Sequence, residues 1–322
     1  MRRKGIFRVA AFVLVVPLLL SVASADAKKK HKKPKSPPVT VVSATQTTSD
    51  DGQRISVTAT CPAGQLAVGG GFKTPILLSG ASLNDLHVIY ESRRIGDNAW
   101  QSSGVREHGS GAAAQLPLTT SVDCRTATLT KKRSKKAASA AKKKKKRLRI
   151  TEVSAAGPSA TTGELSTATA SCPAGTQAIG GGFSSAPDPS TTGQTSFPLY
   201  YASLRSSPTS WFSAFINSGV AAHAVTSYAY CAAGLKLTET SGAAALPASS
   251  NAGLQSATAA SPNCPKGRAL LGGGFSSTTP DPVAGGPILF MTELGPAARS
   301  WHFSAFNFSA VAGNLTAQGI CA

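Results

Sequence analysis

The sequence predicts an all-β protein with three tandem antiparallel repeats, each a small β-sandwich or barrel-like unit closed by one disulfide. Three observations predict this class. A Cys-Pro-x-Gly segment ending in Gly-Gly-Gly-Phe occurs three times, each copy is followed by a Trp and a second Cys, and the intervening runs are short and rich in β-branched and aromatic residues. The alternative architecture is a single three-fold β-prism in which each repeat supplies one sheet.

The landmarks of the repeat keep a fixed order. The copies read CPAGQLAVGGGF at 61–72, CPAGTQAIGGGF at 172–183 and CPKGRALLGGGF at 264–275. Each unit closes with a Thr five residues before its second Cys, at 119, 226 and 316. Because independent landmarks recur in one order, we interpret the chain as a repeat protein.

The runs between the landmarks favour strands. RISVTATC, HVIYES, WFSAFINS and TSYAYC are short and partly alternating, and turn signals such as SSPTS and GPAARS separate them. No stretch of the repeats keeps a helical apolar stripe for three turns.

Six cysteines in an exported chain predict disulfides, and six allow fifteen pairings. Since each repeat owns two cysteines, the simplest pairing is Cys61–Cys124, Cys172–Cys231 and Cys264–Cys321. Pairing across repeats is the alternative. Each predicted bridge closes a loop of about 60 residues, worth roughly 4 kcal/mol in the chain-entropy model.

The N-terminus is typical of an export signal. MRRKGIFR is a positive n-region, VAAFVLVVPLLLSV is an apolar run too short to span a bilayer comfortably, and ASADA offers cleavage after Ala25 or Ala27. We therefore expect a secreted, extracellular protein with association to the cell wall; an uncleaved anchor is the alternative. The predicted organisation is a signal peptide (1–25), a disordered Lys/Pro-rich segment (26–38), repeat 1 (39–130), a Lys/Ala-rich linker (131–147), repeat 2 (148–234) and repeat 3 (235–322).

The net charge of +19 comes from a few segments. Of the 33 basic residues, 4 lie in Met1–Arg8, 6 in Lys28–Lys35 and 12 in Lys131–Arg149, which leaves 11 against 13 acidic residues in the body. We expect the linker to bind polyanions without sequence specificity, in competition with a role as a solvated spacer. The residues expected to do so are Lys131, Lys132, Arg133, Lys142, Lys143, Lys144, Lys145 and Lys146.

The expected partners are anionic wall polymers or a membrane surface, with carbohydrate as a second class. Sequence-specific nucleic-acid binding is not expected of such Lys runs. Aromatic residues that could stack on bases are also absent from between the lysines. Because so many charges in one linker could hardly be buried, we expect repeat 1 to be separable from the others. Repeats 2 and 3 follow each other with almost no linker, and we expect them to pack together.

The glycine triplets could cradle phosphate, but no Gly-Lys-Ser or Gly-Lys-Thr run is present and no helix is expected after them. We expect instead a strand whose glycines permit a bulge or a close approach. Each repeat has one Trp, so we expect the Trp rings to lie on the middle glycines. The predicted pairs are Gly70 with Trp100, Gly181 with Trp211, and Gly273 with Trp301.

Catalytic and metal-binding patterns are missing from the sequence. No histidine recurs in all three repeats, so each is expected to lie on the surface, and Asp188 and Asp281 are expected to form turns. We therefore predict no catalytic residues, no metal and no cofactor. The expected function is a non-enzymatic surface or matrix protein; the alternative is an array of carbohydrate-binding modules. The aromatic platforms of that alternative would be Tyr90, Tyr200, Tyr201 and Phe290.

At the level of CPxGxxxxGGGF, a later Trp and a closing Cys, the chain resembles secreted repeat proteins of unknown function from high-GC Gram-positive bacteria. That resemblance covers about three quarters of the chain and implies export and a small β module. The Cys-Pro-x-Gly turns are also similar to those of the vitelline-membrane outer-layer protein, a three-fold β-prism, although the triple glycine and longer units depart from its pattern.

Overall fold

The computed structural model describes residues 39–50, 52–75, 77–79, 82–108, 115–126, 128–129, 146–186, 198–219, 221–249, 255–278, 287–294, 299–307 and 309–322. These residues form antiparallel β-strands, and no helix occurs among them. The all-β prediction is confirmed. The predicted signal peptide and the segment 26–38 lie outside the described residues.

Repeat 1 is a β-sandwich of two strand layers, β1-β7-β3 and β2-β6-β5. Alternation builds the layers: in β2 the side chains of Ile55, Val57 and Ala59 point inward while their neighbours are exposed. The strands are β1 (Thr40–Thr48), β2 (Arg54–Thr60), β3 (Gln65–Lys73), β4 (Leu77–Ser79), β5 (Ser82–Ile95), β6 (Ala99–His108) and β7 (Leu116–Thr126).

Repeats 2 and 3 reproduce this arrangement. The layers of repeat 2 are β10-β15-β12 and β11-β14-β13, and those of repeat 3 are β16-β21-β18 and β17-β20-β19. The strands of repeat 2 are β10 (Thr151–Ala156), β11 (Leu165–Ser171), β12 (Gln177–Ser184), β13 (Pro198–Ser207), β14 (Ser210–Asn217) and β15 (Thr226–Ala232). The strands of repeat 3 are β16 (Thr238–Leu246), β17 (Gln255–Ala260), β18 (Leu270–Ser277), β19 (Pro287–Leu294), β20 (Trp301–Asn307) and β21 (Gly313–Cys321).

The sandwiches are joined edge to edge. Strand β3 pairs with β19, β12 with β5 and β18 with β13, each through two residue pairs. These junctions make three long sheets, each with one half from one repeat and the other half from another. We call them sheet 1 (repeats 1 and 3), sheet 2 (repeats 1 and 2) and sheet 3 (repeats 2 and 3).

Two expectations about the packing of the repeats are therefore wrong. Repeat 1 is not separable, because both of its innermost strands pair with other repeats and the whole of Ser36–Ala322 forms one compact unit. The prism alternative, with one sheet per repeat, also fails, because every sheet is shared. The physical reason is that inner edge strands would leave their backbone N–H and C=O groups unpaired, and pairing with a neighbour removes that cost.

One hydrophobic core runs through all three repeats. Phe183 of repeat 2 packs edge-on against Phe275 of repeat 3, with ring centroids 6.0 Å apart, and tilts against Tyr200 at 4.0 Å. Phe72 of repeat 1 belongs to the same cluster. The Phe that ends each glycine triplet thus helps merge the three sandwich interiors.

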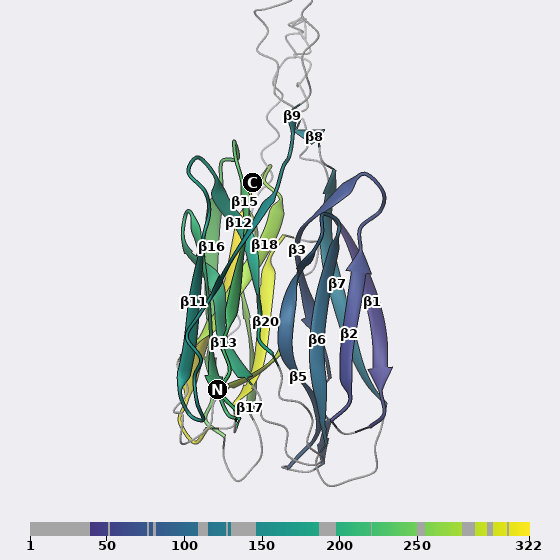
Figure 1. The fold of residues 1–322 in the computed structure, drawn as a ribbon, viewed down its shortest axis with the longest axis vertical. Coiled ribbons are helices and arrows are strands. Elements are labelled where there is room, and N and C mark those ends of the chain that lie inside the picture. Colours follow the sequence, from purple (N-terminus) through teal and green to yellow (C-terminus); the bar gives the residue numbers. More distant parts are fainter. Residues whose placement is uncertain are drawn as a thin grey trace, which may run out of the picture. The chain divides into compact units, whose positions relative to one another are not determined.

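The three disulfides lie at the same end of the strands, which we call the disulfide end. The register places Thr40 opposite Cys124, Thr151 opposite Cys231 and Thr238 opposite Cys321. Two short strands, β8 (Thr128–Leu129) and β9 (Lys146–Arg147), pair beyond this end (Figure 1). Among the described residues no helix has the length and apolar character needed to cross a bilayer.

Candidate functional site

The disulfides follow the predicted pairing within each repeat. Cys61 is bonded to Cys124, Cys172 to Cys231 and Cys264 to Cys321, with Cα–Cα distances of 5.5, 5.6 and 5.7 Å. Each bridge ties a Cys that lies one to four residues after the second strand of its repeat to the end of the last strand, across the two layers. Three such bridges are typical of an oxidising, extracellular environment.

The glycine of each Cys-Pro-x-Gly segment shapes a tight turn. Gly64, Gly175 and Gly267 have φ of 80°, 77° and 84°, in the left-handed region that favours glycine. The N–H of the following residue donates to the carbonyl of the Pro, as in Thr176 to Pro173 at 3.1 Å. The turn lets the chain enter the inner strand directly after the disulfide.

The three glycines of each triplet have three different neighbours. The first glycines, Gly69, Gly180 and Gly272, lie at the centre of the molecule, where β3, β12 and β18 approach one another. A Cβ on Gly69 would lie 2.6 Å from the Leu271 carbonyl oxygen and 2.9 Å from the Gly272 Cα. A β-bulge precedes each of these glycines. The predicted bulge and close approach are therefore present, and the approach is between repeats.

The middle glycines carry the indole rings. A Cβ on Gly70 would lie 2.5 Å from ring carbons of Trp100, and a Cβ on Gly181 would overlap the ring of Trp211. Gly273 stands in the same relation to Trp301. The predicted Gly/Trp pairs are thus contacts within each sandwich, between its two layers.

The third glycines lie at the sheet junctions. A Cβ on Gly182 would meet the Ser92 carbonyl oxygen at 2.5 Å, and a Cβ on Gly274 would meet that of Ser203 at 2.6 Å. Gly71 faces the Thr292 carbonyl in the same way. Any side chain here would push the neighbouring repeat away. The triplet is thus a packing device with one glycine for the centre, one for the Trp and one for the junction.

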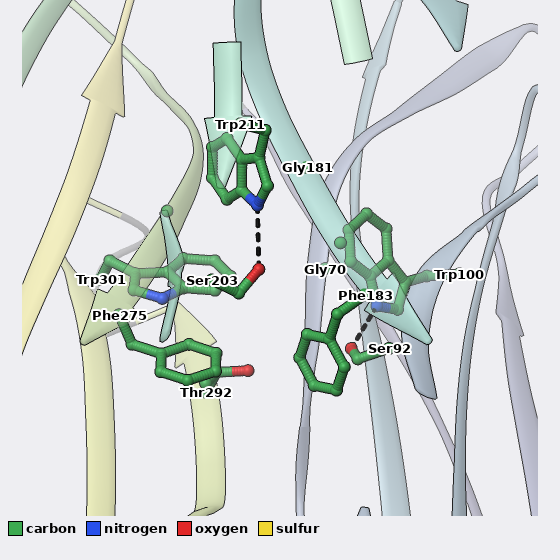
Figure 2. A pocket seen from close by; sticks show the side chains of 12 residues that line it. Gly70, Ser92, Trp100, Gly181, Phe183, Ser203, Trp211, Phe275, Thr292 and Trp301 are labelled. Atoms are coloured by element: carbon green, nitrogen blue, oxygen red, sulfur yellow. Dashed lines mark hydrogen bonds between the residues drawn. The ribbon is translucent and has the colours of Figure 1, made fainter. Parts of the chain in front are cut away.

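A small cavity of about 20 Å³ lies where the three Trp rings converge (Figure 2). Two indoles have hydroxyl partners: Trp100 Nε1 donates to Ser92 Oγ and Trp211 Nε1 donates to Ser203 Oγ, both at 2.9 Å. Trp301 Nε1 is buried and has no hydrogen-bond partner among the described residues. Thr292 stands where the other repeats have their Ser.

The size of this cavity limits its chemistry. It has room for about one water molecule, which needs a cavity of roughly 10–15 Å³. Pockets for small organic ligands are typically about 300–1,000 Å³. The Trp-lined centre is therefore a packed junction and not a ligand pocket.

Sequence reasoning missed two buried ionisable side chains near the centre of the molecule, Asp123 and Arg125. Asp123 is 1% exposed and its Oδ2 has no partner, and burial raises the pKa of this carboxyl to about 8. Two residues on, Arg125 is buried and burial lowers its pKa. Repeats 2 and 3 have Tyr230 and Ile320 in the place of Asp123. An alignment of the three repeats, in which Asp123 is equivalent to an aromatic and an aliphatic residue, is the one sequence signal that could have indicated a carboxyl in the interior.

The aromatic platforms of the carbohydrate alternative do not share one environment. Tyr200 is 2% exposed and lies in the common core, so it is no surface platform; its inward position follows from strand alternation next to a bulge in β13. Tyr201 is also buried. Tyr90 is half-buried, and the side chain of Phe290 lies outside the described residues.

The outer face of sheet 2 carries a connected polar network beside Tyr90. Glu91 accepts hydrogen bonds from Arg93 Nε at 2.6 Å and Gln101 Nε2 at 2.9 Å. The Arg93 guanidinium lies 5.1 Å from the ring centroid of Tyr228, across the junction with repeat 2. This face combines planar rings with hydrogen-bonding groups.

The expectation of surface histidines is wrong for His87 and His223, which are buried. The His87 ring is accommodated because Thr48 Oγ1 and Thr74 Oγ1 each lie 2.9 Å from one of its nitrogens. His302 is half-buried, and the structure does not describe the surroundings of His31 and His108. Asp188 and Asp281 also lie outside the described residues. No group of three metal-ligating side chains occurs in the part of the chain that the structure describes.

The predicted polyanion-binding residues lie almost wholly outside the described residues. Lys131, Lys132, Arg133 and Lys142–Lys145 are not described, and Lys146 is the first residue of β9. The structure does describe the two strands that flank this segment in the sequence, β8 and β9, which pair with each other at the disulfide end.

No protein-family model and no curated protein matches this chain.

Proposed function

We propose that this chain is a non-enzymatic, exported surface or matrix protein that binds anionic envelope polymers through its Lys-rich segments. The β repeats form the stable body, and the Lys segments supply low-specificity electrostatic attraction. The disulfides support an extracellular setting, where wall polymers of repeated phosphate or carboxylate groups are the available polyanions.

The observation that carries the proposal is the register of β1 and β7. It pairs Thr40 with Cys124, so the first strand starts beside the point where repeat 1 ends, five residues after the Lys28–Lys35 run in the sequence. The Lys131–Arg149 segment leaves from that same point, and β9 pairs with β8 to return it there. Two basic segments that are far apart in sequence therefore share one attachment site on the body, which favours joint binding of one polymer.

The test is retention on purified cell wall at low and high salt. The informative variant replaces 131–145 with a Gly/Ser segment of equal length, which keeps β9 and the buried Leu148. We expect wild type to be retained at low salt and released at high salt, and the variant to be retained weakly.

A variant with the residues of 131–145 in scrambled order keeps the charge and is the matched control. We expect it to bind like wild type, because the attraction depends on charge and not on order. Equal retention of wild type and the Gly/Ser variant would remove the electrostatic half of the proposal.

Carbohydrate binding is the second candidate, and the outer face of sheet 2 is the observation that favours it. Tyr90 and the Glu91–Arg93–Gln101 network offer a ring and several hydrogen-bonding groups on one surface. A glycan array separates the two candidates: binding of a neutral glycan that Tyr90→Ala abolishes would support this one.

A further inference from the structure

The exposed basic side chains of the body are unevenly placed. Four of its arginines are buried: Arg94, Arg106, Arg125 and Arg205. Another four basic residues, together with Arg149 at the end of the linker, reach the surface at the disulfide end. We call this set the basic rim; it comprises Arg149, Lys236, Lys266, Arg268 and Arg299.

Two rim residues project from an apolar cap. Leu148 and Ile150 pack with Leu235 and Leu237 in a cluster that also holds Val68, Ile179 and Leu271, the residues before the glycine triplets. Arg149 sits between the first two cap residues and Lys236 between the second two, and both are exposed. Alternation along the chain therefore fixes these two charges outward, over the centre of the disulfide end.

The other three rim residues belong to repeat 3. Lys266 and Arg268 lie in its Cys-Pro-Lys-Gly-Arg turn, where repeats 1 and 2 have Ala and an uncharged residue. Arg268 Nη1 donates to the carbonyl of Lys236 at 2.5 Å, which ties this turn to the cap. Arg299 Nη2 donates to the Cys264 carbonyl at 2.6 Å, so its guanidinium lies beside the same turn.

The rim charges are not neutralised by neighbouring carboxylates. Within the described part of the chain, none of the five forms an ion pair. The exposed carboxylates of Asp97 and Glu239 at this end instead pair with the buried Arg94 and Arg205, at 3.0 and 3.6 Å. The positive field of the rim is thus available to an external anion.

We propose that the basic rim is a preformed polyanion-binding surface for a linear phosphodiester polymer. This inference rests on the proposed function and adds a fixed contact surface, and an orientation, to it. The polymer would run across the disulfide end, with guanidinium groups on its phosphates. Because the rim side chains are carried by packed strands and turns, binding them requires little ordering of the chain.

A polymer fits this surface better than a bilayer does. Of the exposed large apolar side chains in the described residues, only Val41 lies near the disulfide end, and one valine adds little insertion free energy. In the cap, Leu148 is buried, and Ile150, Leu235 and Leu237 are partly buried against the same cluster, which limits the apolar surface they could offer to a lipid. The proposed partner is therefore a phosphodiester polymer and not a lipid surface.

The experiment measures binding of a purified polyglycerol-phosphate chain as a function of salt. The rim variant is Lys236→Gln with Lys266→Gln, two exposed side chains for which the structure gives no hydrogen bond. The matched control is Arg54→Gln with Lys73→Gln, which removes the same charge from the opposite end, where β2 begins and β3 ends. Melting temperatures verify that both variants are folded.

We expect the rim variant to bind several-fold more weakly at low salt, and its plot of log K against log salt to be shallower by about 1 for each lost phosphate contact. The opposite-end control should match wild type. A rim variant that binds like wild type, while the Gly/Ser linker variant loses binding, would overturn the rim and leave the proposed function standing.

Two further outcomes are also decisive. If wild type does not bind the polymer at all, both the proposed function and the rim fail. If wild type binds vesicles with anionic headgroups more tightly than the polymer, and the rim variant reduces only that binding, the partner named here is wrong.

Discussion

At the scale of single residues, the glycine triplet shows how one short segment meets three different demands. Gly180 faces the centre, Gly181 faces Trp211 and Gly182 faces a carbonyl of repeat 1. The spaces differ: a Cβ on Gly180 would have its nearest neighbour at 3.2 Å, whereas a Cβ on Gly181 would overlap the indole. A methyl group should therefore lower the free energy of unfolding much more at Gly181 than at its neighbour Gly180.

Gly181→Ala should lower the free energy of unfolding by about 1–3 kcal/mol, since overpacking forces the Trp211 ring or the backbone to move. Gly180→Ala is the matched control and should cost clearly less. Chemical denaturation monitored by Trp fluorescence measures both. Equal costs for the two variants would show that the ring does not lie on the glycine as described.

The indole hydrogen bonds give a second residue-scale prediction. Ser203→Ala leaves Trp211 Nε1 buried without its acceptor and should cost about 1–3 kcal/mol. Thr292→Val, at the equivalent position of repeat 3, removes a hydroxyl for which the structure gives no hydrogen bond and should be close to neutral. A large cost for Thr292→Val would mean that its hydroxyl serves Trp301 after all. Thermal unfolding of the two variants decides the matter.

Asp123 makes stability depend on pH. Its folded-state pKa, about 8, lies above the ordinary value of 3.8 because of burial. Below about pH 4 the carboxyl is protonated in both states. As the pH rises towards 8 the unfolded chain gives up its proton more readily, so the free energy of unfolding should fall through this window.

Asp123→Asn should flatten that decline and be more stable than wild type at pH 9. Chemical denaturation at several pH values between 4 and 9 measures it. Parallel profiles for the variant and wild type would show that the carboxyl does not titrate in this range.

At the scale of elements, the inner strand of each repeat is positioned by its turn. Gly175 has a φ of 77° and open space where a Cβ would lie, so its demand is conformational only. Gly175→Ala should therefore cost about 1–2 kcal/mol, from the left-handed backbone alone. The measurement is the shift in denaturation midpoint. A stabilising effect would contradict the positive φ.

The sheet junctions are the second feature at this scale. Each rests on two residue pairs and on a third glycine that faces a neighbouring carbonyl. Such short junctions have few backbone hydrogen bonds, and the aromatic contacts of Phe183 and Phe275 behind them complete the association.

At the scale of the whole molecule, shared sheets predict that the repeats stay together without a covalent link between repeats 1 and 2. No disulfide crosses the 131–145 segment. After cleavage at a protease site engineered into that segment, the two fragments should co-elute in native size-exclusion chromatography and separate in denaturant. Separate elution under native conditions would contradict the edge pairing of β3 with β19 and β5 with β12.

The fold class, the repeat, the disulfide pairing and the Gly/Trp pairs could all be predicted from the amino-acid sequence. These features follow from local chemistry. Each repeat has a Cys-Pro-x-Gly turn, alternating strands, two cysteines and one Trp, so few pairings of the cysteines and few positions of the Trp are compatible with it. The bare middle glycine needs a large ring, and each repeat supplies one Trp. The sequence also located the charge, because the Lys runs are contiguous.

How the repeats associate, and which charged side chains face outward, became visible in the three-dimensional arrangement. The sharing of sheets depends on inner edge strands that are distant in sequence, such as β3 and β19, and no local pattern encodes that pairing. The separation of basic residues into buried arginines and an exposed rim likewise depends on long-range packing. Arg94 and Lys236 are both basic residues, and nothing in the sequence around them indicates their burial. Arg94 is buried, whereas Lys236 lies over the cap and is exposed to solvent. Burial is set by what packs against a residue, and in this protein those partners come from other repeats.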